Sequence, residues 1–436
     1  MAASSVHTTE ALLFFTLLQL ALIVLAARAG GALAQRWGQS AVVGEILVGV
    51  LLGPSLFGTV APHAFDAVFR STPAEPLTIL SQVGLLLLMF QIGLEFDFSH
   101  LAERAHRRTV WAVAGAGLVA PFAIGAALGA FMPREIAGTD NRLGFVLFVA
   151  TAFSITALPV LGRILVDFSM TRSALGVIAI SCAAINDVVG WLMLALVSAL
   201  SVSAFAAGPF LLRVLGIALL GVLAWWLVRP LLSRFVQRRL RDATEAMALP
   251  PTLMGAILAC VFVAGMTTYQ LGIFAIFGGF LMGVLLHRET AFVQAWHARV
   301  GSFVNVFFVP IFFTLTGLRT DIGSLHDGSA WGWCVLLIAL ATLGKLGACY
   351  VAARAVGLDS VRARIIGMLM NTRGLMELIV INVGLEMGMI GRQVFTMLVL
   401  MALFSTVITS PALRRWLPRL QATAESAAPA ALSGRG

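Results

Sequence analysis

The sequence predicts an all-α membrane protein that crosses the bilayer many times. Of the 436 residues, 60% are hydrophobic and only 11% are charged, and the mean hydropathy is +0.97. A soluble domain is about half apolar and about a quarter charged, so a soluble chain of this composition would expose large apolar patches and aggregate. Apolar runs of about 20 residues, the length that crosses a bilayer core as a helix, recur from one end to the other.

The apolar runs predict thirteen spans. Only Tyr269, Gln270 and a glycine separate the eighth from the ninth. We expect the spans at residues 11–33, 40–57, 77–95, 109–131, 143–164, 174–202, 209–232, 251–269, 271–287, 302–318, 331–354, 364–386 and 393–413.

Arginine placement orients these spans. With the N-terminus outside the cell, the predicted inner loops hold 19 arginines and the outer loops hold 6. Because cytoplasmic loops carry the excess of positive charge, we expect a multi-pass protein of the cell membrane with its C-terminus in the cytoplasm. Residues 1–10 form an outer tail without the basic start of a cleaved signal peptide, so we expect the first span to be retained.

The membrane domain is expected over residues 11–413, followed by a short cytoplasmic tail, 414–436, whose Ala/Ser-rich composition predicts disorder. The net charge of +9 is scattered between apolar runs, which argues against nucleic acid as a partner. The four cysteines lie far apart inside apolar runs, so neither disulfides nor a thiolate metal site is expected, and we expect no cofactor.

Ionisable residues deep in a span are costly and indicate function. Asp187 follows Asn186 in ISCAAINDVVGWLMLALV. Burial favours its neutral form, so it can exchange a proton, and its ionised form is a hard oxygen ligand for a cation. Lys345 is the only lysine beside 28 arginines. Unlike arginine, a buried lysine can lose its proton, so we expect it to act as a salt-bridge or hydrogen-bond partner near Asp187 rather than to snorkel to an interface.

Two spans are interrupted by polar residues. In the twelfth, MLMNTRGLMELIVINVG, the polar Asn371, Thr372 and Gly374 predict an unwound helix, and Arg373 and Glu377 share one helix face, where they would neutralise each other as a structural pair. In the fifth, TAFSITALPVLGR, Pro159 removes a backbone donor. Its hydroxyls (Thr151, Ser154 and Thr156) either coordinate a cation or bond back to their own helix.

The two interrupted spans run in opposite directions, a pattern that indicates an inverted-repeat transporter with its site at the midplane. Unwound backbone at that depth must line protein or a water-filled cavity. The glycine pairs Gly49/Gly53 and Gly279/Gly283 have the spacing of closely packed helices rather than of a binding site.

Six segments in order resemble the second monovalent cation:proton antiporter family, nearest the plant CHX exchangers and related fungal and bacterial proteins. They span about residues 11–413 and are GEILVGVLLGPSLFG, LLLLMFQIGLEFD, SITALPVLGRIL, AINDVVGWLMLAL, FFVPIFFTLTGLRTDI and MNTRGLMELIVINVG.

The resemblance implies an antiporter fold of thirteen helices, built as an inverted repeat, in a protein that forms homodimers. In this fold a dimerisation domain is joined to a core domain, and the core domain contains two unwound helices that cross. The resemblance maps the competition between cation and proton onto Asn186 and Asp187, the mid-membrane lysine onto Lys345, and the crossing onto Thr151–Pro159 and Asn371–Gly374. Electrogenic relatives carry Asp-Asp where this chain has Asn186-Asp187, so we expect electroneutral exchange of K⁺ or Na⁺, with K⁺ favoured, although Lys345 offers a second proton site. Tyr269 and Phe274 replace an acid and a histidine of many bacterial relatives.

Three other functions are less consistent with the sequence. A potassium channel or uniporter needs a filter such as rings of carbonyls, and no TVGYG-like loop occurs. A membrane enzyme needs haem ligands inside spans or a metal cluster, so we expect no enzymatic activity. A transport-dead sensor on the same fold stays open from the sequence alone.

Overall fold

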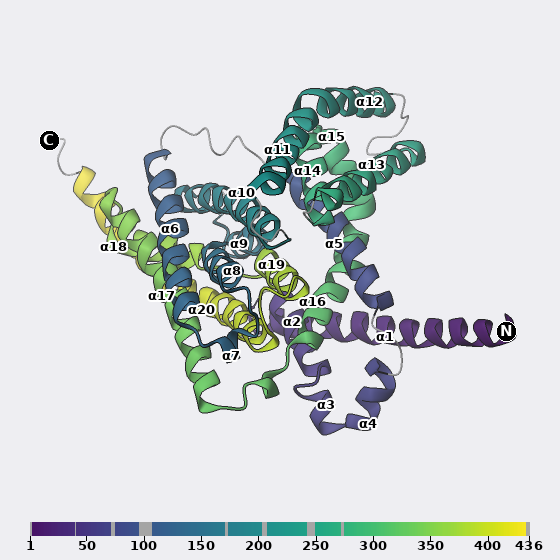
Figure 1. Cartoon of the computed structure of the whole chain (residues 1–436). Helices are drawn as coiled ribbons and strands as arrows, with labels where there is room; N and C mark the ends of the chain where they lie inside the picture. Colours follow the sequence, from purple (N-terminus) through teal and green to yellow (C-terminus); the bar gives the residue numbers. More distant parts are fainter. Residues whose placement is uncertain are drawn as a thin grey trace. The chain divides into compact units, whose positions relative to one another are not determined.

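The computed structural model describes residues 2–39, 41–70, 75–95, 107–170, 173–202, 207–241, 249–271 and 274–432, and these residues form helices and no strands. Figure 1 labels these helices in the order of the chain. The chain divides into two compact units. The first unit comprises Met1–Leu33, Gly44–Asp97 and Ala195–Asp321, and the second comprises Ala34–Val43, Phe98–Leu194 and Ile322–Gly436. Among the loop arginines used to orient the chain, Arg104 and Arg172 lie outside the described residues.

The predicted spans coincide with helical segments. Within the described residues, ten helices are long and apolar enough to cross a membrane, and two shorter apolar helices, Arg142–Ser154 and Ala275–Leu286, accompany them. The all-α membrane fold is therefore confirmed, while thirteen crossings stay a prediction. The fifth and twelfth spans are each split into two short helices, as their polar interruptions predict.

The first unit holds most of the helices from the N-terminal part and the middle of the chain. These are α1 (Ala2–Arg36), α2 (Ala41–Leu52), α3 (Phe57–Val60), α4 (Pro62–Phe65), η1 (Asp66–Arg70), α5 (Glu75–Glu95), α11 (Ala207–Leu223), η3 (Ala224–Val228), α12 (Arg229–Arg241), α13 (Pro251–Gln270), α14 (Ala275–Leu286), α15 (Thr290–Trp296), η4 (His297–Gly301), η5 (Val304–Phe308) and α16 (Val309–Arg319). The end of α1 and the start of α2 belong to the second unit.

Glycines set the closest helix contacts of the first unit. A Cβ on Gly283 of α14 would lie 2.1 Å from the Phe90 carbonyl oxygen of α5, and one on Gly49 of α2 would lie 2.7 Å from the Thr314 Cα of α16. Any larger side chain would force these helices apart. The predicted packing role of the glycine pairs is confirmed.

The second unit contains the two interrupted spans. Its helices are α6 (Arg107–Phe131), α7 (Arg134–Ala137), α8 (Arg142–Ser154), α9 (Leu158–Asp167), α10 (Ala174–Val202), η6 (Ile322–Ser324), α17 (Gly328–Ala355), α18 (Ser360–Met370), α19 (Leu375–Glu386) and α20 (Arg392–Leu432). The last turns of α10 belong to the first unit.

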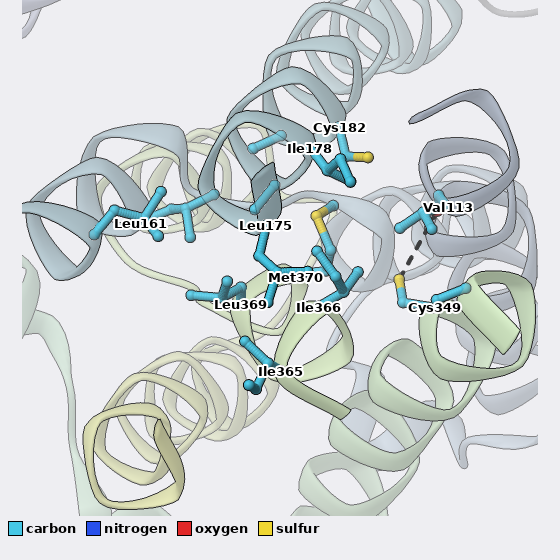
Figure 2. Close-up of a cluster of buried hydrophobic side chains, with 14 of the residues drawn as sticks. Val113, Leu161, Leu175, Ile178, Cys182, Cys349, Ile365, Ile366, Leu369 and Met370 are labelled. Atoms are coloured by element: carbon cyan, nitrogen blue, oxygen red, sulfur yellow. Dashed lines mark hydrogen bonds between the residues drawn. The ribbon is translucent and has the colours of Figure 1, made fainter. Parts of the chain in front are cut away.

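A buried apolar cluster joins six helices of the second unit, α20 through Leu413 and five others (Figure 2). Val113 comes from α6, Leu161 from α9, Cys182 from α10, Cys349 from α17 and Ile366 from α18, and all five are fully buried. The Cys349 thiol lies 3.9 Å from the Val113 carbonyl oxygen, a contact too long to be more than weak. This cluster fixes the half-helices α9 and α18 against the continuous helices α6, α10 and α17.

Both chain ends differ from the sequence prediction. Helix α20 continues to Leu432, whereas disorder is predicted over 414–436, and α1 begins at Ala2, inside the predicted N-terminal tail. Alanine has the highest helix propensity of all residues, and the segment ATAESAAPAAL is rich in it. Once an apolar helix is nucleated inside the protein, extending it costs little.

Candidate functional site

The two interrupted spans meet at their breaks. Helix α8 ends at Ser154, and α9 begins at Leu158 with Pro159 in its first turn, where a proline is tolerated. Helix α18 ends at Met370, and α19 begins at Leu375. The Ala157 amide donates to the Thr372 carbonyl at 3.1 Å, and Thr156 Oγ1 donates to the Met370 carbonyl at 3.2 Å. The first break therefore donates two hydrogen bonds to the backbone of the second.

Gly374 makes the second break possible. Its φ of +151° is a backbone conformation that residues with a side chain rarely adopt. A Cβ at this position would also lie 2.7 Å from Val160 Cγ2 of α9. Glycine is thus required both by the backbone and by the close approach of α9.

Two buried cations cap the carbonyl end of α8. Arg373 donates from Nη1 to the Ala152 carbonyl and from Nη2 to the Phe153 carbonyl, each at 2.9 Å, and the Lys345 ammonium donates to the Ser154 carbonyl. The last carbonyls of a helix have no partner within the helix and carry partial negative charge. Arg373 and Lys345 satisfy them in a place that water does not reach, since Arg373 is 1% exposed and Lys345 is 0% exposed.

The predicted pair of Arg373 and Glu377 is present. Arg373 Nη1 lies 2.7 Å from Glu377 Oε1, and both side chains are fully buried. Thr406 Oγ1 of α20 lies 2.5 Å from the Arg373 carbonyl oxygen and 2.9 Å from the Ala402 carbonyl oxygen of its own helix, and the first contact ties α20 to the break. No pattern in the sequence indicates Thr406, because a hydroxyl in an apolar helix ordinarily bonds back to its own backbone.

Asn186 and Asp187 of α10 reach the break of α8 and α9. Asn186 Nδ2 donates to Thr156 Oγ1 at 3.4 Å. Asn186 Oδ1 and both carboxylate oxygens of Asp187 are buried and accept no hydrogen bond from any described residue. Unpaired buried oxygens are costly, so three of them on adjacent residues of one helix make this position the candidate functional site.

Asp187 faces positive charge without a direct ion pair. The Leu158 amide, at the N-terminal end of α9, and the Lys345 ammonium both act on its carboxylate electrostatically, and neither makes a hydrogen bond of ordinary geometry to it. No contact ion pair joins Asp187 and Lys345, both of which are described residues. The ammonium donates its hydrogen bond to the Ser154 carbonyl instead, and the role of Lys345 as a partner near Asp187 stays a prediction.

The other predicted site residues differ in their hydrogen-bond partners. Thr151 Oγ1 donates to the Leu147 carbonyl at 2.7 Å, Ser154 Oγ to the Thr151 carbonyl at 2.8 Å, and Thr372 Oγ1 to the Leu369 carbonyl at 2.7 Å, so all three bond to nearby backbone. Asn371 is fully buried and neither amide atom bonds to a described residue. Of the predicted hydroxyls, only that of Thr156 joins the two breaks to Asn186.

Gly117 of α6 is a site residue that the sequence did not reveal. A Cβ there would lie 2.7 Å from Cys349 Sγ and 3.6 Å from Asn186 Nδ2. Its position in the glycine- and alanine-rich stretch AVAGAGLVAPF was the only available signal, and such stretches are common in packed membrane helices.

The sequence profile described as "Sodium/hydrogen exchanger, transmembrane" matches residues 21–418. The chain belongs to this family. The match covers both broken spans and every predicted site residue. The family resemblance indicated by the six motifs is confirmed.

Curated relatives support the same assignment. The Na(+)/H(+) antiporter NhaS4 of Synechocystis sp. is 36% identical over 403 residues, which make up 92% of this chain and 96% of that protein. Cation/H(+) antiporter 18 of Arabidopsis thaliana is 35% identical over 91% of this chain, and K(+)/H(+) antiporter 1 of Saccharomyces cerevisiae is 31% identical over 86%. The chain spans about half the length of these plant and yeast relatives.

A solved structure shares the fold. The sodium proton antiporter MjNhaP1 of Methanocaldococcus jannaschii superposes with a TM-score of 0.65 over 94% of this chain and 98% of that chain. At 14% sequence identity, this likeness establishes the fold and nothing finer.

Proposed function

We propose that this protein exchanges a monovalent cation, K⁺ or Na⁺, for protons across a membrane. The observation that carries the proposal is the buried set of oxygens on Asn186 and Asp187, which have no hydrogen-bond partner among the described residues. Carboxylate and amide oxygens are suitable ligands for a hard cation, and a proton satisfies the same carboxylate when the cation leaves.

Asp187 is the exchanging group in this mechanism. On one side of the membrane it releases its proton and binds the cation; the unit that carries it then opens to the other side, where the cation leaves and a proton returns. A bare carboxylate in an apolar medium is expensive, so the site does not cross empty and charged. That penalty couples the two fluxes.

The neighbouring charges support electroneutral, one-for-one exchange. Glu377 is held by Arg373 at 2.7 Å, and Lys345 is held by the Ser154 carbonyl. Asp187 is the acidic group of this site that lacks a contact partner among the described residues. One free carboxylate exchanges one proton for one monovalent cation, and Asn186, steadied by Thr156, adds an oxygen but no charge.

The names of the relatives are consistent with either K⁺ or Na⁺ as the transported ion. They include Na(+)/H(+) and K(+)/H(+) antiporters and the Na(+)/H(+)-K(+) antiporter GerN of Bacillus cereus. We place this chain in the cell membrane as a homodimer with its N-terminus outside and its C-terminus in the cytoplasm, with lipid, cation and proton as its partners.

Purified protein in proteoliposomes tests the function. A pH gradient with an acidic lumen is imposed, KCl, NaCl or choline chloride is added outside, and a trapped dye reports lumenal pH. Exchange predicts collapse of the gradient with K⁺ or Na⁺ and none with choline, and the rate stays the same when a permeant anion holds the membrane potential near zero. Cation flux that builds a membrane potential and moves no protons would instead identify a channel, and no flux in folded protein would favour a sensor.

A further inference from the structure

Helix α12 extends a membrane helix into a basic surface. The apolar α11 and η3 lead into α12, which carries five arginines in 13 residues: Arg229, Arg234, Arg238, Arg239 and Arg241. Figure 1 shows α12 following α11 and η3 along the chain. By the predicted topology, this end of the span faces the cytoplasm.

One side of α12 is fixed to the core of the first unit. Leu232 is 8% exposed and Val236 is 0% exposed, and both belong to a buried cluster with Phe292 and Trp296 of α15. Three of the five arginines lie on the other side. Arg234, Arg238 and Arg241 are exposed and follow the i, i+4, i+7 spacing, so they form one row along the helix.

No acidic group of the described residues neutralises this row. Arg234, Arg238 and Arg241 make no ion pair there, and the neighbouring carboxylate of Glu289 accepts instead from Gln237, at 3.1 and 3.2 Å. Within the described residues, which on this side end at Arg241, the row therefore has no counter-charge. A row that served stability would be expected to carry its own counter-charges.

Aromatic residues place the start of α12 at a membrane boundary. Trp226 is 77% exposed, and Arg229 stacks over the ring of Trp225 at 4.2 Å from its centroid. Tryptophan is enriched at the headgroup level of bilayers, and arginine stacked on an aromatic ring keeps its donors free for phosphate. Arg229 thus lies close to the level of lipid headgroups, and the arginine row begins between one and two turns further along α12.

We propose that the exposed face of α12 binds the phosphate-bearing headgroups of anionic phospholipids. Guanidinium groups grip phosphate oxygens through paired hydrogen bonds, and each arginine near an anionic surface strengthens binding about fivefold. A purely topological role for these arginines requires positive charge but no preference between lipids, so lipid selectivity separates the two.

Detergent-solubilised full chain is titrated with phosphatidylglycerol or phosphatidylcholine, and bound lipids are counted by native mass spectrometry. The test variant is Arg238→Gln/Arg241→Gln. The matched control is Arg107→Gln/Arg108→Gln, which removes two exposed arginines at the start of another membrane helix, α6. Arg238→Lys/Arg241→Lys retains the charge without the paired donors.

The proposal predicts that phosphatidylglycerol binds the wild type and the control in preference to phosphatidylcholine. In the glutamine test variant its affinity falls about 25-fold, with intermediate affinity in the lysine variant. Equal loss in test and control variants, or equal binding of the two lipids, overturns it. Displacement of the lipid by millimolar inorganic phosphate would assign the site to a free anion and would likewise overturn it.

Discussion

The Lys345 ammonium donates a hydrogen bond to the carbonyl of Ser154, the last residue of α8. The lysine thus closes the end of a half-helix, and it reaches Asp187 only through its electric field. Arg373 does the same for the two preceding carbonyls. The crossing is held by cations from two other segments, which leaves the carboxylate of Asp187 open.

Replacing Lys345 should lower stability as well as transport. Lys345→Gln leaves the Ser154 carbonyl with a weaker, neutral donor, and losing a buried hydrogen bond to a charged group costs about 1.5–3 kcal/mol. The midpoint of thermal unfolding in detergent measures this loss. The control, Arg134→Gln, removes an exposed charge and should change stability by less than about 0.5 kcal/mol. An unchanged midpoint in Lys345→Gln would contradict the capping role.

Arg373 and Glu377 should couple strongly. Arg373→Met leaves two carbonyls unpaired and strands a buried carboxylate, at a cost of about 3–5 kcal/mol. Glu377→Met should cost less stability, because the Arg373 guanidinium still donates hydrogen bonds to two carbonyls. The double variant should therefore be more stable than the sum of the single losses predicts, by about 1 kcal/mol or more in a double-mutant cycle. Additive losses would mean that the pair makes no direct contact.

Gly374→Ala should destabilise the second break. The φ of +151° and the contact with Val160 Cγ2 both oppose a Cβ, so we expect a loss of about 1–3 kcal/mol. Gly332→Ala is the matched control, since a Cβ at that position of α17 meets nothing within 4 Å and alanine favours the helix. Thermal midpoints of the two variants should move in opposite directions; a neutral Gly374→Ala would show that the break is not constrained.

Transport should show competition between cation and proton. If both occupy Asp187, the cation concentration for half-maximal rate rises about tenfold for each unit of pH lowered, once the carboxyl is mostly protonated. The maximal rate at saturating cation should stay nearly constant over the same range. Initial rates at four or five pH values measure both quantities. A half-saturating concentration independent of pH would place the two ions on separate groups.

Much of the fold could be predicted from the sequence. Apolar run length located the spans, and the polar residues Asn371–Gly374 and Thr151–Pro159 located both breaks, because irregular backbone at that depth is tolerated only where protein or a water-filled cavity surrounds it. The helical tail beyond residue 413 was not predicted. Its composition indicates that the segment has no apolar core of its own, but the high helix propensity of alanine lets it extend an existing helix.

The candidate site was predicted less completely. Asp187 and Lys345 could be identified because ionisable residues are rare deep inside membrane spans. The four-residue spacing of Arg373 and Glu377 on a helix predicted their ion pair, which the structure contains. Spacing along a chain does not report which backbone carbonyl comes within reach, so the bond between Lys345 and Ser154 and the one between Thr406 and Arg373 were missed. The hydroxyls of Thr151 and Ser154 were ambiguous for the same reason, and the structure shows that they bond to nearby backbone.

If Asp187 carries the exchange, Asp187→Asn abolishes it. Inside-out vesicles with wild type, Asp187→Asn or Glu377→Gln receive a pH gradient and then KCl or NaCl, and a pH-sensitive dye reports collapse. We expect cation-dependent collapse in the wild type, none in folded Asp187→Asn, and residual exchange in Glu377→Gln. Undiminished collapse in Asp187→Asn would contradict it and move the exchanging carboxylate elsewhere, with Glu377 the next to test.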